Sequence, residues 1–261
     1  MKNEFINQQP NQSLAKALLI LDTFNIGQTE WGVRELSREL EINPATVYRI
    51  LTTLTNAGYL EQDQDTQRYS LGPKVLRLAN LYLHQNPLPE TAQKVFESFA
   101  DRFQYNFYLG TLVNFQLVYL AVFDGRGPIK IVVETGGVIS LHSTALGKVL
   151  LSFQSDEFIR QFMEAVPLVG YTPRTIKDKA VLWEQIQKIR EQKYAINDGE
   201  HYDEVGAIGV PVYDKQNRVK LAVSLAYPRH LMHEKRINIE SLVDLANQVA
   251  AEIAARTTQI S

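Results

Sequence analysis

The sequence predicts an α+β protein with two domains, and three observations support this class. Its 261 residues suit two domains, since single domains usually hold about 100–200 residues. The first third of the chain has apolar residues at helical spacing, followed by a short hairpin pattern. After residue 105, runs of strand length are interspersed with helical segments, which is typical of an antiparallel sheet with helices on its faces.

The stretch 33–72 has the pattern of a winged helix-turn-helix. Apolar residues recur at helical spacing on either side of Asn43-Pro44, and these two residues suit the N-cap and the first position of the second helix. A glycine ends that helix, and two strand-length runs, 59–62 and 67–71, then flank a polar turn. They predict a hairpin, which is the wing of this motif.

The second helix of this motif carries the candidate DNA contacts. With its apolar residues turned inward, its outward face is small and polar and carries Arg49, which suits the major groove of DNA better than Lys/Glu pairs would. Arg68 on the wing is expected to meet phosphate. The alternative is a small helical domain with a hairpin and no nucleic-acid partner. The predicted DNA contacts are Arg34, Ala45, Thr46, Tyr48, Arg49, Thr52 and Arg68.

Composition and charge narrow the classes of function. The chain has no cysteine, which excludes disulfide frameworks, thiolate nucleophiles and cysteine-ligated metal sites. The uncharged run 105–123 approaches the length of a membrane span, but its Asn, Gly and Gln residues favour a buried hairpin and no membrane partner. Residues 1–85 hold eight Lys/Arg and nine Asp/Glu, so DNA binding should depend on dimerisation and specific contacts.

Four segments are expected along the chain: a disordered polar lead (1–12), a winged helix-turn-helix domain (13–72), a linker helix (73–88) and a second domain (89–261). Ser13 is expected to cap the first helix. The linker helix has too many apolar residues for an isolated connector, so we expect it to pack on a second copy. The expected inner face of the first helix consists of Leu14, Ala17, Leu18, Leu21 and Phe24.

The second domain contains a candidate ligand site. A glycine-led, uncharged loop, 136–143, enters a helix through Thr144, so free amides at Ala145 and Leu146 suit a carboxylate at the positive end of that helix. A plain capped helix is the alternative. Strands rich in Phe and Tyr, together with Ser224, suit a mostly apolar pocket. The expected strands are 106–113, 116–123, 129–134, 207–214 and 218–227, and the expected helices are 89–104, 144–152, 155–165, 179–191 and 236–256.

Enzyme signatures are absent from the sequence. Gly147-Lys148 lacks the flanking residues of a phosphate loop, and no G-x-S-x-G or H-E-x-x-H sequence occurs. We therefore expect no enzymatic activity and no cofactor. His142 and His201, with Asp203 and Glu204 near the latter, are the candidate metal ligands, although nothing in the sequence brings them together, and we assign no metal site. An enzyme or a metabolite-binding module whose helical domain serves assembly only is the alternative function.

Seven stretches of the chain occur in the order found in a known family. The first domain contains SLAKALLILDTF, VRELSRELEINPATVYRILTTLTNAGYLE and RYSLGPKVLRLA. The second contains LHSTALGKVLLSF, YTPRTI, IREQKYAINDGEH and IGVPVYDKQNRVKLAVSLAYP. From about Ser13 to Arg256 the chain thus resembles the IclR (isocitrate-lyase-regulator) family of bacterial transcription factors. The resemblance implies a winged helix-turn-helix, a linker helix and a GAF-like effector domain with an antiparallel sheet.

In this family a small organic acid binds in the effector domain, with its carboxylate on amides that fall here on Ala145 and Leu146. An acidic residue is frequent where Asn197 stands, and an Arg-Cys or similar pair is common near Gly206-Ala207. These departures imply a larger, less polar cavity and a bulkier effector, with aromatic acids included. The effector residues that the resemblance implies are Ile131, Ile139, Ala145, Leu146, Asn197, Val205, Ala207, Ser224 and Ala226.

The predicted function is that of a cytoplasmic, ligand-responsive transcriptional regulator, either a repressor or an activator. Its predicted partners are double-stranded operator DNA, a small organic acid, and further copies of itself in a dimer or tetramer. The cytoplasmic assignment depends on the first residues, which lack the apolar segment of a signal peptide.

Overall fold

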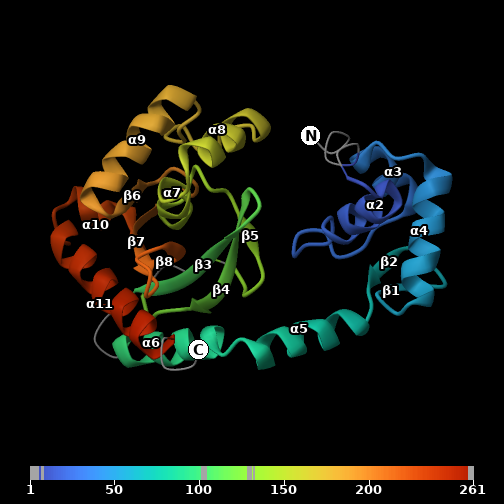
Figure 1. Cartoon of the computed structure of the whole chain (residues 1–261), viewed down its shortest axis with the longest axis horizontal. Helices are drawn as coiled ribbons and strands as arrows, with labels where there is room; N and C mark the ends of the chain where they lie inside the picture. The colour runs from blue at the N-terminus through green and yellow to red at the C-terminus, as the bar shows by residue number, and fades with distance from the viewer. Residues whose placement is uncertain (1–5, 7–8, 101–104, 128–130, 132, 258–261) are drawn as a thin grey trace. The chain divides into compact units, whose positions relative to one another are not determined.

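A computed structural model of the chain describes residues 6, 9–100, 105–127, 131 and 133–257. The chain divides into two compact units, residues 1–86 and 87–261 (Figure 1). Every strand pair in the described part of the chain is antiparallel, and helices pack on the larger sheet, which confirms the α+β class.

The first unit is a winged helix-turn-helix, as the sequence predicts. Its elements are α2 (Gln12–Leu21), α3 (Val33–Leu40), α4 (Pro44–Asn56), β1 (Leu60–Gln62), β2 (Tyr69–Leu71) and α5 (Lys74–Gln85). Asn43 caps α4, because its side-chain oxygen accepts a hydrogen bond from the Ala45 amide at 2.9 Å, and Pro44 takes the first helical position. Strands β1 and β2 form the wing, with Leu60 opposite Leu71.

Helix α2 turns a different face to the core from the one that the sequence suggests. Its N-cap is Asn11, whose side chain accepts from the Leu14 amide at 3.0 Å, and not Ser13. Ala15 is buried, whereas Leu14 and Leu18 are 56% and 48% exposed. The expected inner face is therefore wrong for Leu14 and Leu18, whereas Leu21 and Phe24 pack against the core as expected. Apolar residues surround most of this helix, so spacing alone does not select a face.

The two ends of the first unit differ in burial. Ile6 lies in the apolar core, although residues 1–12 are expected to be a disordered lead; residues 1–5 and 7–8 lie outside the described part of the chain. Helix α5, in the position of the expected linker helix, has no buried residue. Its large apolar side chains are therefore not covered within the first unit. The exposed ones are Leu76, Leu78, Leu81, Tyr82 and Leu83.

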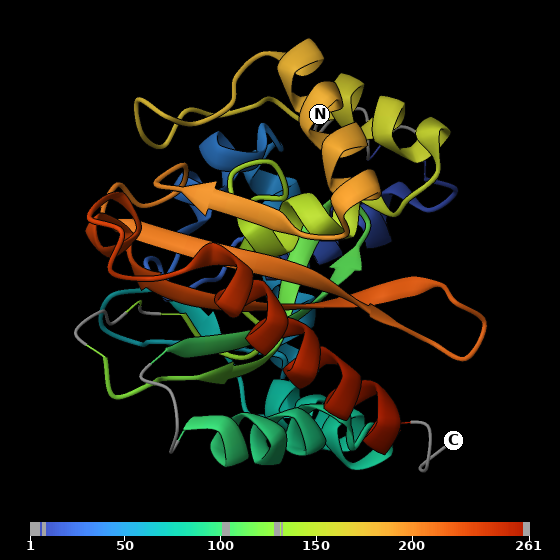
Figure 2. The same cartoon turned by 90° about the vertical axis from the view of Figure 1, so that its left-hand side faces the viewer.

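The second unit is built on a six-stranded antiparallel sheet. Its elements are α6 (Leu88–Ala100), β3 (Asn106–Val113), β4 (Gln116–Phe123), β5 (Val138–Ile139), α7 (Ala145–Ser152), α8 (Asp156–Ala165), α9 (Lys179–Gln192), β6 (Ala195–Asp198), β7 (Val205–Tyr213), β8 (Val219–Pro228), α10 (Arg229–His233) and α11 (Ile239–Thr257). The strand order is β5-β4-β3-β8-β7-β6. Helices α6 and α11 cover one face, and α7 lies on the other, with α8 and α9 completing that layer (Figures 1 and 2).

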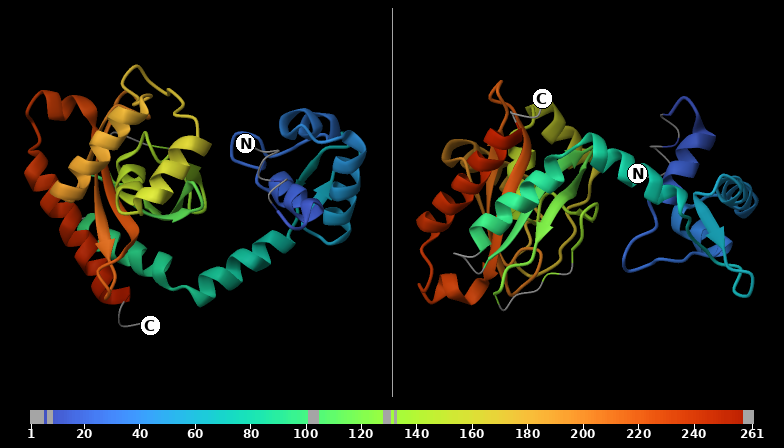
Figure 3. Two further views of the ribbon diagram at one scale, coloured as in Figure 1. Left: turned by 45° about the horizontal axis from the view of Figure 1, so that its top comes forward. Right: turned by 90° about the horizontal axis from the view of Figure 1, so that it is seen from below.

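Side chains alternate between the two layers along the central strands. On β3, Phe107 and Leu109 belong to the core under α6 and α11. These two helices pack against each other, as Figure 3 shows. Tyr108 and Gly110 face α7 on the opposite side. The sheet therefore separates two apolar cores, and residues two apart on a strand belong to the same core.

The sequence misplaces a few short elements of this unit. The run 129–134 is not a strand where it is described, since Ile131 and Val133 have no regular structure, and residues 129, 130 and 132 lie outside the described chain. The end of the expected helix 89–104, from residue 101, also lies outside it. The strand that pairs with β4 at this edge of the sheet is β5 instead. Strand β6 and helix α10 are not anticipated, because four or five residues are too few to show a period.

The uncharged run 105–123 forms the hairpin of β3 and β4, as expected, with Val113 opposite Gln116 across the turn. This pairing satisfies the backbone hydrogen bonds of a stretch that is otherwise rich in apolar residues. Among the residues that the structure describes, no helix combines the length and the apolar character that crossing a membrane requires.

Candidate functional site

Helix α4 presents the polar face that the sequence predicts. Val47 and Leu51 are buried, whereas Tyr48, which is 55% exposed, and Arg49 lie on the outer side. The Thr52 hydroxyl donates to the Tyr48 carbonyl at 2.9 Å, so it is turned back onto the helix. Arg49 and Tyr48 are thus the long side chains of an exposed helix that is anchored on its opposite face. This arrangement suits a helix that enters the major groove of DNA.

Arg68 on the wing is bound within the first unit. Its guanidinium donates to both carboxylate oxygens of Glu35, at 3.1 and 2.8 Å, and to the Glu30 carbonyl at 2.9 Å. Hydrogen bonds from Arg68, and then from the Gly32 amide, lower the pKa of Glu35. The predicted contact of Arg68 with phosphate stays a prediction, and the structure adds that the guanidinium already binds Glu35 and Glu30. The bidentate pair occupies the guanidinium and ties the wing to the start of α3.

A cavity opens on the α7 face of the sheet in the second unit. It contains about 440 Å³ of empty space, and this figure includes its open mouth. The structure brings all nine residues of the expected effector site to its wall, and no Lys, Arg, Asp or Glu is among the described residues that line it. The sequence did not assign the other lining residues to the site; they are Tyr108, Tyr119, Thr144, His201 and Tyr202.

The start of α7 lies close to the sheet because glycines lie where it makes contact. A Cβ on Gly209 of β7 would come within 2.7 Å of the carbonyl carbon of Ala145. A Cβ on Gly110 of β3 would come within 2.6 Å of the Leu146 side chain, and one on Gly147 would overlap the preceding loop. This close approach buries all eight residues of α7.

Two main-chain N–H groups at this helix start have no acceptor among the described residues. Thr144 accepts from the Gly147 amide through its hydroxyl at 3.0 Å and from the Lys148 amide through its carbonyl at 2.9 Å. The amides of Ala145 and Leu146 are left over, and both residues line the cavity. Because the positive end of the helix dipole lies here as well, this end of the cavity suits a carboxylate.

A row of small side chains forms another part of the wall. Asn197 on β6, Ala207 on β7 and Ala226 on β8 are direct cross-strand partners, so they point to the same face of the sheet. Ser224 lies in the neighbouring row, opposite Tyr108 of β3. The methyl groups and the serine hydroxyl take little space, which leaves room for a ligand over these strands.

Asn197 and Lys148 hold the loop between β6 and β7 from the inside. The Asn197 amide donates to the Ser143 carbonyl at 2.5 Å, and its oxygen accepts from the Gly199 and Glu200 amides at 3.0 and 3.1 Å. Lys148, which is only 1% exposed, forms a 2.5 Å ion pair with Glu200. Asn197 is therefore engaged in ordering this loop, a role that the resemblance did not indicate.

Gly206 does not enlarge the cavity, contrary to expectation. It pairs with Tyr227 across β7 and β8 on the opposite face of the sheet, and a Cβ on Gly206 would overlap the Tyr227 ring. Its neighbour Ala207 does line the cavity. The alternation of a strand places adjacent residues on opposite faces, so one residue of the pair affects the ligand space and the other affects packing under α11.

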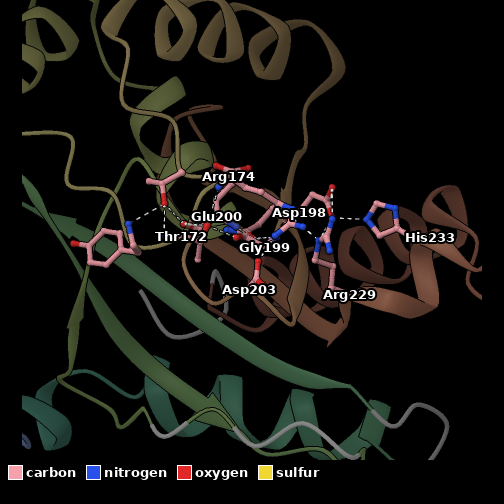
Figure 4. Close-up of polar contacts among 11 residues, drawn as sticks. Thr172, Arg174, Asp198, Gly199, Glu200, Asp203, Arg229 and His233 are labelled. Carbon is pink, nitrogen blue, oxygen red and sulfur yellow. Dashed lines mark hydrogen bonds and ion pairs between the residues drawn. The ribbon is translucent and has the colours of Figure 1, made fainter.

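The outer side of the same loop is fixed by residues from the segment before α9, as Figure 4 shows. Thr172 donates to the Gly199 carbonyl at 2.6 Å, and the Thr175 hydroxyl donates to the Glu200 carbonyl at 2.6 Å. Arg174 and Asp203 form an ion pair beside them. The loop is therefore held at its backbone as well as at its side chains.

A third set of contacts comes from α10. Asp198 accepts a hydrogen bond from Arg229 Nε at 2.6 Å and lies 2.8 Å from His233 Nε2 (Figure 4). Burial alone would raise the pKa of the Asp198 carboxyl, but the hydrogen bonds from His233 and Arg229 outweigh burial and lower this pKa below its usual value. These contacts lie on the sheet face opposite the cavity, so they support the loop without touching a ligand.

The two candidate metal ligands bind protein groups. His142 Nδ1 lies 2.8 Å from Ser140 Oγ and its Nε2 lies 3.0 Å from the Val169 carbonyl, while His201 Nδ1 lies 2.7 Å from Ser143 Oγ. Burial, and secondarily His142, lowers the pKa of His201 to about 4, so this ring is neutral at pH 7. Within the described ranges, no three His, Asp or Glu side chains are grouped to hold a metal ion.

A winged helix-turn-helix in one unit and a mostly apolar cavity at a helix start in the other are the features of one class of protein, the ligand-responsive transcriptional regulators. Comparison with known families agrees with this class. The IclR helix-turn-helix domain matches residues 13–64, and the family described as "Bacterial transcriptional regulator IclR C-terminal" matches residues 80–255. The chain belongs to the IclR family of bacterial transcriptional regulators, which confirms the resemblance.

Individual relatives span nearly the whole chain. The HTH-type transcriptional regulator KdgR of Escherichia coli (strain K12) is 28% identical over 258 residues, which are 98% of this chain and 97% of KdgR. A crystal structure of an IclR-type regulator from Silicibacter sp. TM1040 is 30% identical, with a TM-score of 0.80 over 93% of this chain and 96% of that one.

A more distant crystal structure shares the fold. It is an IclR homolog from Microbacterium hydrocarbonoxydans complexed with 4-hydroxybenzoate, which is 21% identical, with a TM-score of 0.75 over 95% of this chain and 100% of that one. The families and the KdgR relative are named as transcriptional regulators, and the chain is accordingly a regulator and not an enzyme.

Proposed function

We propose that this regulator binds a small organic carboxylate in the cavity of its second unit and that binding changes its affinity for operator DNA. The observation that carries the proposal is the buried start of α7, where the amides of Ala145 and Leu146 meet a cavity whose described lining residues include no acidic or basic side chain. Helix N-termini of this kind bind anions. The relative crystallised with 4-hydroxybenzoate supports an aromatic acid as one candidate.

The remaining wall suits the body of such an acid. Ile131, Ile139 and Val205 supply apolar surface, which favours a hydrocarbon chain or ring over a polyhydroxylated ligand. Ala207 and Ala226 leave space beside them. Most of the binding free energy should therefore come from apolar burial, with the carboxylate fixing the orientation of the ligand.

For DNA, we infer that α4 enters the major groove and reads base edges. Arg49 and Tyr48 have the reach, and Ala45, Thr46 and Thr52 are small enough to let the helix approach. We also propose that Arg34 on α3, whose side chain is exposed, contacts phosphate. We assign Arg68 an indirect part through the position of the wing, since Glu35 occupies its guanidinium. A DNA target also places the protein in the cytoplasm.

A proline scan at helix starts tests the effector site. Ala145→Pro removes one of the two cavity amides, yet proline is well tolerated at the first position of a helix, and Thr144 already has the extended backbone that precedes proline. We expect this variant to fold and to lose most of the rise in melting temperature that small carboxylic acids cause in the parent protein. Lys179→Pro, at the exposed first position of α9, is the matched control.

The same acids should alter binding to DNA selected by the protein from a random-sequence pool, as measured in a gel shift. An acid that stabilises the parent protein and leaves DNA binding unchanged would show a ligand-binding module without regulation. If the acids stabilise Ala145→Pro as much as they stabilise the parent protein, the assignment of the α7 amides to the carboxylate site is wrong.

We also propose that α5 pairs with a second copy of the chain. Its exposed apolar residues, among them Leu76 at 63% exposure, have no cover within their own unit, and an isolated helix of 12 residues is marginal in water. Leu76→Glu should convert dimers or tetramers to smaller species, as judged by light scattering after size exclusion. Gln85→Glu, which adds the same charge at the end of the same helix, should leave the mass unchanged.

A further inference from the structure

Tyr108 is a buried polar residue in the wall of the effector cavity. It lies on β3 opposite Ser224 of β8, so both side chains leave the sheet toward α7. Only 4% of Tyr108 is exposed, and its ring lies 5.6 Å from that of Tyr119, which also lines the cavity. The aromatic part of Tyr108 is thus packed on apolar neighbours, and its hydroxyl is the part without an obvious function in the fold.

No hydrogen bond of ordinary distance and angle joins the Tyr108 hydroxyl to another described residue. Asn106, two positions earlier on the same face, is its polar neighbour, and the Asn106 side-chain oxygen accepts from the Gly125 amide at 2.8 Å. Burial raises the pKa of Tyr108 well above its ordinary value, and a weaker hydrogen-bonding interaction with Asn106 offsets part of the rise, so the phenol keeps its proton at neutral pH. It is therefore available as a hydrogen-bond donor.

Burial of a hydroxyl without a partner is unfavourable, and phenylalanine would fill the same space without this cost. Most buried polar side-chain atoms in proteins are paired, so an unpaired one beside a cavity indicates a function outside the fold. Its cross-strand neighbour Ser224 adds a second short polar group to the same part of the wall. The start of α7 supplies donors from a different element, which separates the carboxylate subsite from this one.

We propose that Tyr108 is the specificity-determining residue of the cavity and donates a hydrogen bond to a second oxygen of the effector. This inference rests on the proposed function, since the α7 amides hold the carboxylate. The effector is then a carboxylic acid that also carries a hydroxyl or carbonyl oxygen, not a simple hydrocarbon acid. A site built to pair with such an oxygen rejects the analogue that lacks it, because the buried donor is left unpaired.

Paired acids that differ by one oxygen test this assignment by calorimetry. The aromatic set is benzoate with 3- and 4-hydroxybenzoate, and the aliphatic pair is pentanoate with 4-oxopentanoate. In the parent protein we expect at least one oxygenated acid to bind about tenfold more tightly than its partner, or better. Tyr108→Phe should reduce this ratio to about threefold or less and change the affinity for the plain acid little.

Tyr227→Phe is the matched control, since Tyr227 is also a buried tyrosine of the same sheet but lies on the opposite face, with its hydroxyl 3.5 Å from Met232 Sδ. It should keep the ratio of the parent protein. Without any acid, Tyr108→Phe should melt at the same temperature as the parent or slightly higher. A clearly lower melting temperature would show that the hydroxyl has a structural partner, and this result would overturn the proposal.

The binding results also separate this inference from the proposed function. If the parent protein binds plain and oxygenated acids equally, or if Tyr108→Phe keeps the ratio, the carboxylate site stands and the role of Tyr108 is wrong. If the parent protein binds none of the acids while Ala145→Pro and the parent protein behave alike, the carboxylate site itself is wrong, and the inference fails with it.

Discussion

Helices α4 and α7 carry the two proposed recognition tasks, and they present different parts of a helix. Both begin at a residue whose side chain accepts an amide hydrogen bond, Asn43 in α4 and Thr144 in α7. Helix α4 exposes a row of side chains to solvent along its length. All eight residues of α7 are buried, and its first two amides are the groups left over at the cavity. Recognition by α4 should depend on side-chain identity, and recognition by α7 on how closely its backbone approaches the sheet.

The charged residue within each helix shows the same contrast. Arg49 of α4 is exposed, whereas Lys148 of α7 is buried and paired with Glu200 in the loop between β6 and β7. Burial lowers the pKa of Lys148, and Glu200 beside it opposes that shift, so the charge on the lysine depends on the pair remaining intact. Substitution of the two cations should therefore affect different properties of the protein.

Lys148→Met is expected to have the largest effect. It leaves Glu200 buried without its cation, and removal of one partner from a buried ion pair costs about 3–5 kcal/mol. Urea unfolding of the second unit measures this loss in free energy of unfolding. The double variant Lys148→Met/Glu200→Gln should recover a large part of it, because no charge is then left unpaired. A loss below about 1 kcal/mol in the single variant would mean that water or another group reaches Glu200.

Gly209→Ala tests how closely α7 must approach the sheet. The new methyl group would lie 2.7 Å from the backbone of Ala145, so α7 must shift, and overpacking of this kind costs about 1–3 kcal/mol. We expect a lower melting temperature together with weaker binding of carboxylic acids. Gly110→Ala meets only the flexible tip of the Leu146 side chain and should have a smaller effect on both. Equal effects of the two variants would show that the backbone position of α7 is not the decisive factor.

Arg49→Ala should change DNA binding and leave stability nearly unchanged. The side chain is exposed, so the free energy of unfolding should stay within about 0.5 kcal/mol of the parent value. If Arg49 makes a bidentate contact with guanine, binding to the preferred DNA should weaken by about 1–3 kcal/mol. Titration of preferred and scrambled DNA checks this point. A loss of the same size on both sequences would assign Arg49 to phosphate contact.

His201 should give the smallest effect, and it concerns pH. Its pKa is lowered to about 4 by burial, against about 6.5 in an unfolded chain, so between these values the unfolded state takes up a proton that the folded state does not. The contribution of the neutral His201 ring to the free energy of unfolding is therefore complete above pH 6.5, and it is lost as the pH falls toward 4. Because the ring is partly exposed, we expect a loss of about 1–2 kcal/mol. Chemical unfolding at pH 7.5 and 4.5 should show a smaller difference for His201→Gln than for the parent.

The first unit was the easier one to predict, and α4 shows why. Its buried and exposed faces follow from the spacing of Val47 and Leu51, and Asn43-Pro44 marks its start. All the information needed to predict this helix therefore lies within the helix and its cap. Helix α2 is the counterexample. It has apolar residues on most sides, and for this reason Leu14 and Leu18 were predicted to be buried although they are exposed. In the second unit, α7 was found from its capped start, but its complete burial has no periodic signature.

The cavity shows a similar division. The resemblance identified nine of its residues, yet Tyr108 was missed, although its signal was present in the alternation of the strand 106–113. The resemblance assigned both Gly206 and Ala207 to the cavity, but the alternation of the strand places Gly206 on the other face. Asn197 and Glu200 could not be connected to Ser143 and Lys148 from the sequence, since these pairs join residues more than fifty positions apart.

The sequence by itself determined the fold class, the winged helix-turn-helix and the capped start of α7, because spacing and capping act between residues a few positions apart. Tertiary structure alone decided that Arg68 binds Glu35, that Lys148 is buried with Glu200, and that the Tyr108 hydroxyl lies beside the cavity with no hydrogen-bond partner among the described residues. These features arise when distant segments are packed together, and the burial that results sets the hydrogen bonds and charges of the site.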